Sequence, residues 1–506
     1  MVRAVVLVLV FAVAAVAQRK GRHERWPFGN DGNAAASMLQ KRDLFNLGPL
    51  GAKAWDADRP EPSAERASGR QRFENGGERG EDVGPKRLLV RALFGGGPAQ
   101  KAGLRLDDVI VGVDGRDFQG GCFAPLADAI LRAEAKTGKL VLQVERAGKA
   151  LSLTVKLKKL GKAASNPEAG KQRDRLLKAA CAWLADHQQG GGFPETLGGT
   201  NGAVVMTCLA GLAWVSVGSS LKKGKHKAEL NSAVSFVLRN LGTSRSLGDT
   251  GANWDQTTWG YAHAAIFLGE LQLAGGSKKV AGELQEIADI LCKRQEASGG
   301  YGHGPGGRNA LGYIELNILA AYVLCGLSLA EQNGCEVDAQ VVDKLLGYCR
   351  ESAGEDGGVG YATGPGQKGM GNIGRTAGTW LGARGLGRGG DPFPQRMKAY
   401  VQKHIAAITD GHASLQQHIL LAGIAAAALG GEVEQAYWDG GLRRDLTLAR
   451  APDGSFHPRP WHESLLMNSN TDVSMGEVWT TASWAIVLGA RGTGRRGGLP
   501  GLCGGR

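Results

Sequence analysis

The sequence predicts a multidomain protein in which a small α+β module precedes an all-α domain built from helical hairpins. A helical unit of about fifty residues recurs about six times between Lys171 and Ala490, and each copy joins two helices through a glycine-rich turn. Residues 43–160 instead show the pattern of short strands and one helix. A chain of 506 residues is too long to fold around a single hydrophobic core of ordinary size, so two or three domains are expected.

Residues 1–17 are expected to be a secretory signal peptide. They combine a basic start, a short apolar stretch and the small residues Ala15-Val16-Ala17. This is the pattern of a cleavable signal, and it is shorter than the about 20 apolar residues that cross a bilayer. We therefore expect an exported protein, periplasmic or extracellular, that is membrane-anchored only if the signal is retained. A basic linker at residues 18–42 follows.

The module at residues 43–160 is expected to form a small α+β barrel. Alternating apolar residues mark its strands, and glycine and proline mark its turns. A polar insert at residues 56–86 interrupts the strand that follows the first turn. The expected elements are a strand at 86–93, a short helix and turn at 97–104, a strand at 107–115, a helix at 125–136 and a hairpin formed by 140–144 and 151–157.

Two segments of this module carry a resemblance. GPAQKAGL at residues 97–104, followed by DDVIVGVDG at residues 107–115, resembles a PDZ domain of the bacterial type. The resemblance implies binding of a protein C-terminus or extended peptide, which adds as a strand while backbone N–H groups hold its carboxylate. The matching loop is Gly48-Pro49-Leu50-Gly51, where Pro49 lacks one N–H. The alternative is a module that only packs as a spacer.

A linker at residues 161–172 leads into the helical domain at residues 173–490, and a basic, disordered tail is expected at residues 491–506. The second helix of each hairpin is rich in Ala, Gly and Leu, as expected for helices packed closely on both sides. The leading helices are expected at 173–187, 230–241, 279–294, 339–351, 394–409 and 434–448. Their partners are expected at 201–217, 256–274, 309–330, 372–386, 414–429 and 472–488.

The turn QEASGGY at residues 295–301 resembles the Q-x-x-x-G-G-aromatic motif of terpenoid cyclases and protein prenyltransferase β subunits. The resemblance implies an (α/α)6 toroid in which the partner helices form the inner ring. The catalytic motifs of these families are missing. The repeats hold no D-x-D-D acid motif, Gly374-Arg375-Thr376 stands where prenyltransferases have Asp-x-Cys, and the G-C-G-E-Q motif of complement-like thioester domains is absent.

Polar residues in the first turns of the inner helices form the candidate site, because these turns converge at one end of a toroid. Asp255, Trp259 and His263 share one helix face at i, i+4 and i+8. Such residues suit general acid/base chemistry or recognition of an anion, and helix capping is the alternative. The catalytic candidates are His418, Glu315, Asp472, Arg375, Asp255 and His263. The aromatic candidates for a ligand cavity are Tyr313, Trp461, Trp479 and Trp259.

We expect neither a metal nor a cofactor, since the histidines form no H-x-x-H or H-E-x-x-H pattern. The 8 cysteines are scattered without a C-x-x-C pair and predict buried free thiols, with Cys325 and Cys335 the first candidates for a disulfide. The net charge of +12 comes partly from the two basic ends, and export argues against a nucleic-acid partner.

The sequence leaves three functions open. The first is an exported binding or scaffold protein that joins a PDZ-like module to a toroid with an unknown ligand. The second is a glycan-active lyase or hydrolase that uses the polar first turns. The third is an isoprenoid-handling enzyme, as the toroid resemblance implies. Whether the protein is an enzyme is therefore undecided at this stage.

Overall fold

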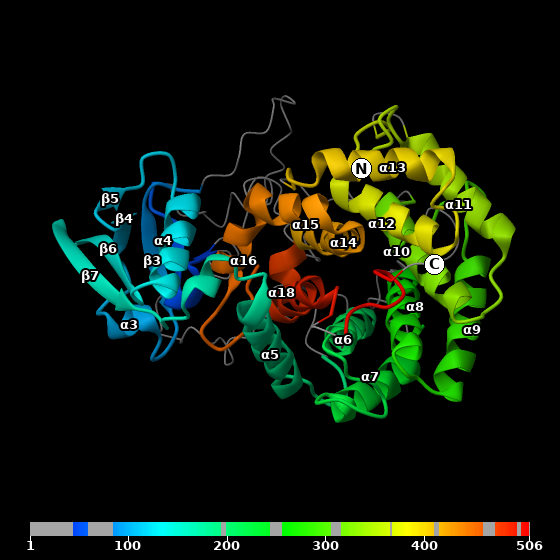
Figure 1. Cartoon of the computed structure of the whole chain (residues 1–506), viewed down its shortest axis with the longest axis horizontal. Helices are drawn as coiled ribbons and strands as arrows, with labels where there is room; N and C mark the ends of the chain where they lie inside the picture. The colour runs from blue at the N-terminus through cyan, green and yellow to red at the C-terminus, as the bar shows by residue number, and fades with distance from the viewer. Residues whose placement is uncertain are drawn as a thin grey trace, which may run out of the picture. The chain divides into compact units, whose positions relative to one another are not determined.

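The computed structural model describes residues 44–58, 84–193, 199–242, 256–304, 315–364, 367–408, 414–458, 471–492 and 497–504. These residues fall into two compact units. The N-terminal unit holds the described residues up to Ser165 together with the segment Thr447–Pro452. The second unit holds the remaining residues and is mostly helical (Figure 1).

The N-terminal unit is built on one antiparallel sheet of order β1-β2-β3-β4-β6-β7, with β5 paired to β4. Its strands are β1 (Phe45–Asn46), β2 (Ala52–Asp56), β3 (Leu88–Leu93), β4 (Val109–Val113), β5 (Arg116–Asp117), β6 (Lys139–Arg146) and β7 (Lys149–Lys156). Its helices are η2 (Gly48–Leu50), α3 (Pro98–Lys101), α4 (Phe123–Ala135) and η4 (Lys162–Ser165).

The apolar core of this unit lies between the sheet and α4, whose buried face includes Leu126 and Ile130. Each strand and helix predicted from residue 86 onward is present within a few residues of its expected bounds. The polar insert does not interrupt a strand, however. Asp56 at the end of β2 pairs with Leu88 at the start of β3, so the insert falls between two paired strands. Residues 59–83 of the insert lie outside the described residues.

The helical unit consists of outer and inner helices that alternate along the chain. The outer helices are α5 (Gly170–Asp186), α7 (Lys227–Asn240), α9 (Lys278–Lys293), α11 (Ala339–Ser352), α13 (Pro392–His404) and α15 (Gly431–Tyr437), the last continuing through η6 (Trp438–Leu442) and α16 (Arg443–Ala449). The inner helices are α6 (Gly199–Ser216), α8 (Thr257–Leu273), α10 (Asn317–Gln332), α12 (Ile373–Gly385), α14 (Leu415–Leu429) and α18 (Thr471–Gly489).

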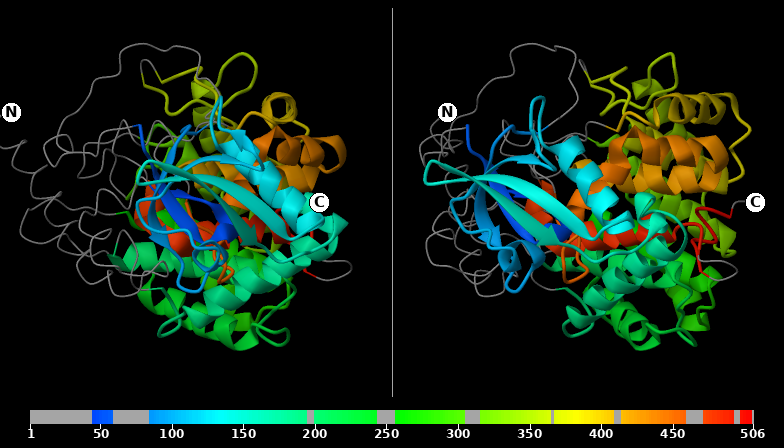
Figure 2. Two further views of the ribbon diagram at one scale, coloured as in Figure 1. Left: turned by 90° about the vertical axis from the view of Figure 1, so that its left-hand side faces the viewer. Right: turned by 60° about the vertical axis from the view of Figure 1, so that its left-hand side comes forward.

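The inner helices form a closed ring, because each one contacts the next and α18 returns to contact α6. Figure 2 shows these helices from two further directions. Small residues permit the close approach. Gly211 on α6 faces the ring of Phe267, and Gly382 on α12 faces the backbone of Leu324, at distances that leave no room for a Cβ atom. This is the physical reason for the Ala- and Gly-rich composition of the predicted partner helices.

Two predicted helices differ from the structure. The helix predicted at 309–330 begins at Asn317 in the structure, and residues 305–314 lie outside the described residues. The helix predicted at 434–448 is broken at η6, where Gly440 and Gly441 leave helical geometry. A Cβ atom at Gly440 would lie 2.0 Å from the carbonyl oxygen of Ala406. The backbone at the break therefore packs directly on the backbone of Ala406, which only glycine allows.

The prediction of a disordered tail is wrong for residues 497–504, which pack against the C-terminal ends of the inner helices. Backbone N–H groups of Gly498 and Leu499 donate to the last turns of α6 and α18, and those of Gly501 and Leu502 donate to Glu270 on α8. Gly501 lies so close to α10 that a side chain at this position would collide with Leu329. Arg384 on α12 donates a hydrogen bond to the Leu502 carbonyl oxygen, and the Cys503 thiol donates one to the carbonyl oxygen of Ile424 on α14. The segment thus covers one end of the ring.

The prediction of buried free thiols holds for five cysteines, whereas Cys292, Cys335 and Cys503 are partly exposed. All eight cysteines lie in the described part of the chain and are free thiols, so Cys325 and Cys335 form no disulfide. Burial raises the pKa of the Cys325 thiol to about 12, which keeps it protonated and unreactive. In the described ranges, no helix has the length and apolarity needed to cross a membrane.

Candidate functional site

The Asp472 carboxylate in the first turn of α18 is held by donors from two inner helices. It accepts hydrogen bonds from the Ser414 hydroxyl, from the Gln416 backbone N–H at 3.0 Å and from the Trp479 indole N–H at 2.9 Å. Burial raises the pKa of Asp472, and these donors act in the opposite direction because they favour the charged form. The carboxylate therefore ties the start of α14 to α18.

A second cluster joins α8 to α10 through aromatic and histidine rings. Trp259 Nε1 lies 2.8 Å from Nδ1 of His303, and Nδ1 of His263 lies 2.8 Å from the carbonyl oxygen of Trp259. The ring centroids of His263 and Tyr322 are 4.4 Å apart. Because a carbonyl can only accept, Nδ1 of His263 carries the proton, and Nε2 of the neutral ring is left as an acceptor.

Two polar atoms of this cluster have no hydrogen-bond partner among the described residues, namely His263 Nε2 and the Tyr322 hydroxyl. Both residues are only 2% exposed. Burial lowers the pKa of His263 to about 4 and raises the pKa of Tyr322 well above its ordinary value, so both side chains are neutral at pH 7. An unsatisfied buried polar atom costs about 1–3 kcal/mol, so both atoms are suited to bind a further group.

The two clusters lie within electrostatic range of each other. Burial is the main cause of the raised pKa of Tyr322, and the charge of Asp472 adds to it. Between Asp472 and Trp479, α18 leaves helical geometry at Gly476, whose φ is 77°. A Cβ atom at Gly476 would meet no described atom within 4 Å, so the space on that side of the break holds no described residue. We call Trp259, His263, Tyr322, Asp472 and Trp479 the inner site.

Arg375 and Glu315, two of the predicted catalytic residues, are engaged by nearby turns. Arg375 is buried and donates to the carbonyl oxygens of Val359 at 3.3 Å and Met370 at 3.0 Å. The Glu315 carboxylate accepts from the Ser298 hydroxyl at 3.4 Å. Both side chains therefore hold the turns that join outer to inner helices.

The remaining predicted residues divide between a helix contact and positions that the structure does not describe. His418 on α14 is buried against α12, since a Cβ atom at Gly374 would lie 2.4 Å from its Nδ1 atom. Asp255, Tyr313 and Trp461 lie outside the described residues. The described ranges contain no group of histidine, cysteine and carboxylate side chains that could hold a metal ion.

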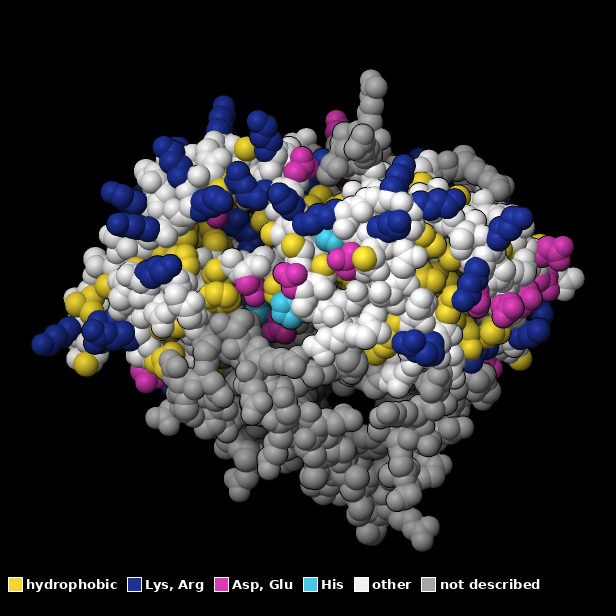
Figure 3. Space-filling view, turned by 90° about the horizontal axis from the view of Figure 1, so that it is seen from below, with side chains coloured by type: hydrophobic (Ala, Val, Ile, Leu, Met, Phe, Trp, Pro, Cys, Tyr) yellow, Lys and Arg dark blue, Asp and Glu magenta, His cyan; other side chains and the backbone are white. Residues whose placement is uncertain are grey.

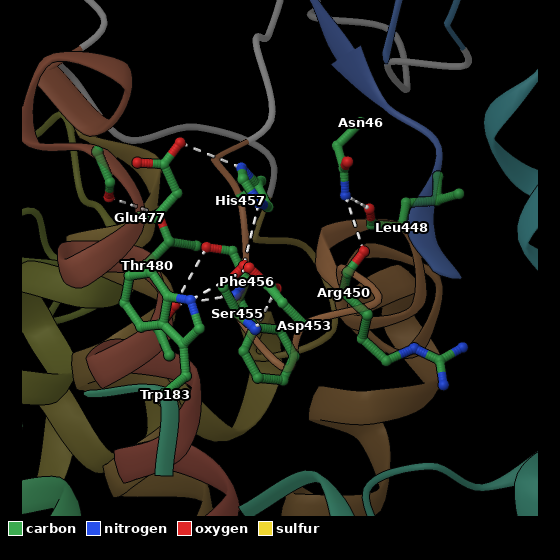
Figure 4. A network of polar contacts seen from close by, with 12 residues as sticks. Asn46, Trp183, Leu448, Arg450, Asp453, Ser455, Phe456, His457, Glu477 and Thr480 are labelled. Atoms are coloured by element: carbon green, nitrogen blue, oxygen red, sulfur yellow. Dashed lines mark hydrogen bonds and ion pairs between the residues drawn. The ribbon is translucent and has the colours of Figure 1, made fainter. Parts of the chain in front are cut away.

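A further constellation, which sequence reasoning missed, lies in the turn before α18. Ser455 Oγ is 3.1 Å from His457 Nε2, and His457 Nδ1 is 3.2 Å from a carboxylate oxygen of Glu477 (Figure 4). Hydroxyl, imidazole and carboxylate follow one another as in a hydrolase triad. No sequence motif marks these three residues, because such a set is recognised by its geometry and not by its spacing.

The hydroxyl of Ser455 is already used, however. It donates to Asp453 Oδ1 at 2.7 Å, and the other oxygen of Asp453 accepts from Trp183 on α5 at 3.2 Å. A hydroxyl has one proton, so Ser455 can only accept from His457 while it donates to Asp453. Ser455 and His457 are each 1% exposed. The network thus ties the turn at residues 453–457 to the first outer helix, α5, and does not activate the Ser455 hydroxyl as a nucleophile.

The loop predicted to bind a peptide forms η2 between β1 and β2. Gly48 and Gly51 adopt φ angles of 65° and 72°, which favour glycine. Strand β2 pairs with β1 on one side and with β3 on the other, so over Ala52–Ala54 both of its hydrogen-bonding edges are occupied. A peptide added as a strand beside β2 would have to displace β1.

Among the described residues on one face of the molecule, basic side chains are spread out. Figure 3 shows lysine and arginine side chains scattered across the visible face, with acidic side chains among them. A nucleic-acid-binding face typically gathers such charges into one stripe or patch.

These observations define a chain in which an antiparallel sheet module accompanies a ring of helical hairpins with a buried polar site. The chain matches the family described as Domain of unknown function (DUF6288) over residues 174–489, and it belongs to this family. The matched residues include the whole inner site. No curated protein matches the sequence.

Among solved structures, the chain is similar to the type II terpene cyclase MstE from Scytonema in its apo form, with 15% identity and a TM-score of 0.38, covering 62% of this chain and 98% of that chain. It is also similar to a variant of that cyclase in complex with its substrate geranylgeranyl dihydroxybenzoate, with 15% identity, a TM-score of 0.36 and coverage of 63% and 97%.

Proposed function

We propose that the helical domain is a binding domain whose inner site holds a neutral, hydroxyl-bearing ligand. The observation that carries this proposal is the pair of buried atoms, His263 Nε2 and the Tyr322 hydroxyl, that have no partner among the described residues. A ligand hydroxyl can donate to His263 Nε2 and accept from Tyr322 at the same time. The rings of Trp259 and Tyr322, with centroids 6.0 Å apart, would contact its apolar part.

Charge favours a neutral ligand over an anion. His263 is uncharged at pH 7 because burial lowers its pKa to about 4, and Asp472 brings negative charge close to Tyr322. Arg375 already donates to two carbonyl oxygens. An anion in the inner site would therefore find no cation among its residues. An isoprenoid alcohol and a sugar both carry the required hydroxyl group.

Binding is favoured over the glycan-active alternative, which needs several acid and base side chains around one cavity. Glu315 accepts from the turn at Ser298, and Asp472 accepts from three donors. Among the described residues, neither carboxylate is paired with a second acid or base, as glycoside hydrolysis requires. The proposal includes export, predicted from residues 1–17, and a binding or scaffold role for the N-terminal module.

Titration of the full chain with farnesol and, separately, with methyl β-glucoside tests the proposal by calorimetry. One of the two should bind, and Tyr322→Phe should weaken that binding about tenfold, the effect of one lost hydrogen bond. Tyr348→Phe is the matched control, because the Tyr348 hydroxyl donates to the Glu315 carbonyl at 3.0 Å. The proposal fails if neither probe binds and native mass spectrometry finds no retained mass, or if Tyr322→Phe binds like the wild type.

A further inference from the structure

The N-terminal unit contains a short segment from a distant part of the sequence. Thr447–Pro452, the last turn of α16 and the residues after it, belongs to this unit and not to the helical one. The side-chain amide of Asn46, on β1, donates to the carbonyl oxygen of Leu448, 402 residues away, and to that of Arg450 at 3.0 Å (Figure 4). Two backbone carbonyls of the segment are thereby satisfied by one side chain.

The segment covers the loop predicted to bind a peptide. A Cβ atom at Gly48 would lie 2.7 Å from the Thr447 carbonyl oxygen, and one at Gly51 would lie 2.9 Å from Pro452. Both glycines therefore allow the segment to lie directly on η2. Leu448 is 3% exposed and is part of the same apolar core as Ile130 on α4.

A buried ion pair fixes the other end of the contact. The Arg450 guanidinium lies 2.9 Å and 3.4 Å from the two carboxylate oxygens of Glu134 on α4, a bidentate arrangement. The two side chains are 6% and 5% exposed. Such a pair fixes geometry strongly, because removal of either partner leaves a buried charge without compensation.

We propose that Thr447–Pro452 is a built-in ligand of the N-terminal module. Leu448 packs in the apolar core with Leu50 of η2 and Ile130 of α4, Arg450 pairs with Glu134, and the Asn46 amide donates to the carbonyl oxygens of Leu448 and Arg450. The module therefore recognises an internal chain segment with leucine followed two residues later by arginine. This mode needs neither a free carboxylate nor a free strand edge, which agrees with the missing N–H of Pro49 and with the pairing of β2 on both sides.

A competition experiment on the full chain tests this assignment. The probe is a fluorescein-labelled peptide with the sequence of residues 445–454, followed by fluorescence anisotropy. The tethered segment has an effective concentration on the order of millimolar, so the wild type should bind the peptide at least 100-fold more weakly than the opened variant Leu448→Ala/Arg450→Ala. A peptide with alanine in place of its leucine and arginine should bind neither protein.

Two further variants separate release of the segment from a general loss of structure. Asn46→Ala, added to the opened variant, removes the two hydrogen bonds that the module makes to the Leu448 and Arg450 carbonyls and should weaken peptide binding about tenfold relative to the opened variant. Arg443→Ala, on α16 like Leu448, breaks an ion pair with Glu168 in the helical unit. This variant should leave the segment bound and should exclude the peptide as the wild type does. Equal peptide binding by the wild type and the opened variant would overturn the proposal. So would the failure of the opened variant to bind the peptide while circular dichroism shows it folded.

Discussion

The two ends of the inner helices differ in whether their buried polar groups have hydrogen-bond partners among the described residues. At the C-terminal end, the Glu270 carboxylate is buried and accepts backbone N–H groups of Gly501 and Leu502 at 3.0 Å and 2.7 Å. In the N-terminal halves of the helices, His263 Nε2 and the Tyr322 hydroxyl have no partner in the described part of the chain. The first end is completed by the protein's own backbone. Because the second end has buried polar atoms without a described partner, we place ligand binding there.

Removal of the C-terminal segment should have the largest effect. A chain that stops after Gly492 loses the buried side chains of Leu499 and Leu502 and both donors to Glu270. Each lost leucine costs about 2–5 kcal/mol, so the free energy of unfolding should fall by at least about 5 kcal/mol. Urea unfolding measures it, and a chain that stops after Gly504 is the control. A loss below about 1 kcal/mol would mean that the segment does not complete this end.

Acid should destabilise the other end through His263. Its pKa is about 4 in the folded protein and about 6.5 when unfolded, so between these values the unfolded chain binds more protons and stability falls as pH falls. His263 alone should contribute a loss of about 3 kcal/mol from pH 7 to pH 4. His263→Phe keeps the ring beside Tyr322 and should remove this part of the pH dependence. Urea unfolding at several pH values gives the answer, and identical slopes for both proteins would contradict the buried neutral histidine.

Glu270 should give a pH effect of the opposite sign. Burial raises its pKa to about 7 although two N–H donors lower it, so between about pH 4.5 and 7 the folded protein binds more protons than the unfolded chain. Stability should therefore fall as pH rises through this range, by about 3 kcal/mol. In Glu270→Gln this fall should be absent, so that it no longer offsets the acid sensitivity of His263 and His303, whose pKa values are both about 4. A Glu270→Gln variant with the wild-type pH profile would show that the carboxyl group titrates normally.

The repeat period and the small-residue helices were sufficient to predict the helical hairpins, because periodicity and close packing are local properties of a sequence. Trp259 and His263 were correctly placed on one face of α8 for the same reason, and their rings lie 6.3 Å apart. Tyr322 was missed, since it is surrounded by apolar residues of α10 and nothing in the sequence shows that its hydroxyl lacks a partner.

Long-range contacts explain the other misses. The basic composition of the C-terminal segment suggested a solvated tail, but its apolar residues Leu499 and Leu502 are buried. The contact of Asn46 with Leu448 and Arg450 spans hundreds of residues and has no local signature. The short Ser455-Phe456-His457 run likewise acquired its carboxylate neighbour only through folding.

The smallest predicted effect compares two tyrosines that differ only in whether the hydroxyl is satisfied. Tyr322 and Tyr348 are each 2% exposed, but only the Tyr348 hydroxyl has a described partner, the Glu315 carbonyl. Tyr348→Phe should lower the melting temperature through the loss of about 1 kcal/mol, whereas Tyr322→Phe in the ligand-free protein should leave it unchanged or raise it, because an unsatisfied polar atom is removed. Added ligand should reverse the order, since only the wild-type Tyr322 would then gain a hydrogen bond. Equal destabilisation by both variants without ligand would mean that the Tyr322 hydroxyl is already bonded within the protein, and the inner site would lose its main support.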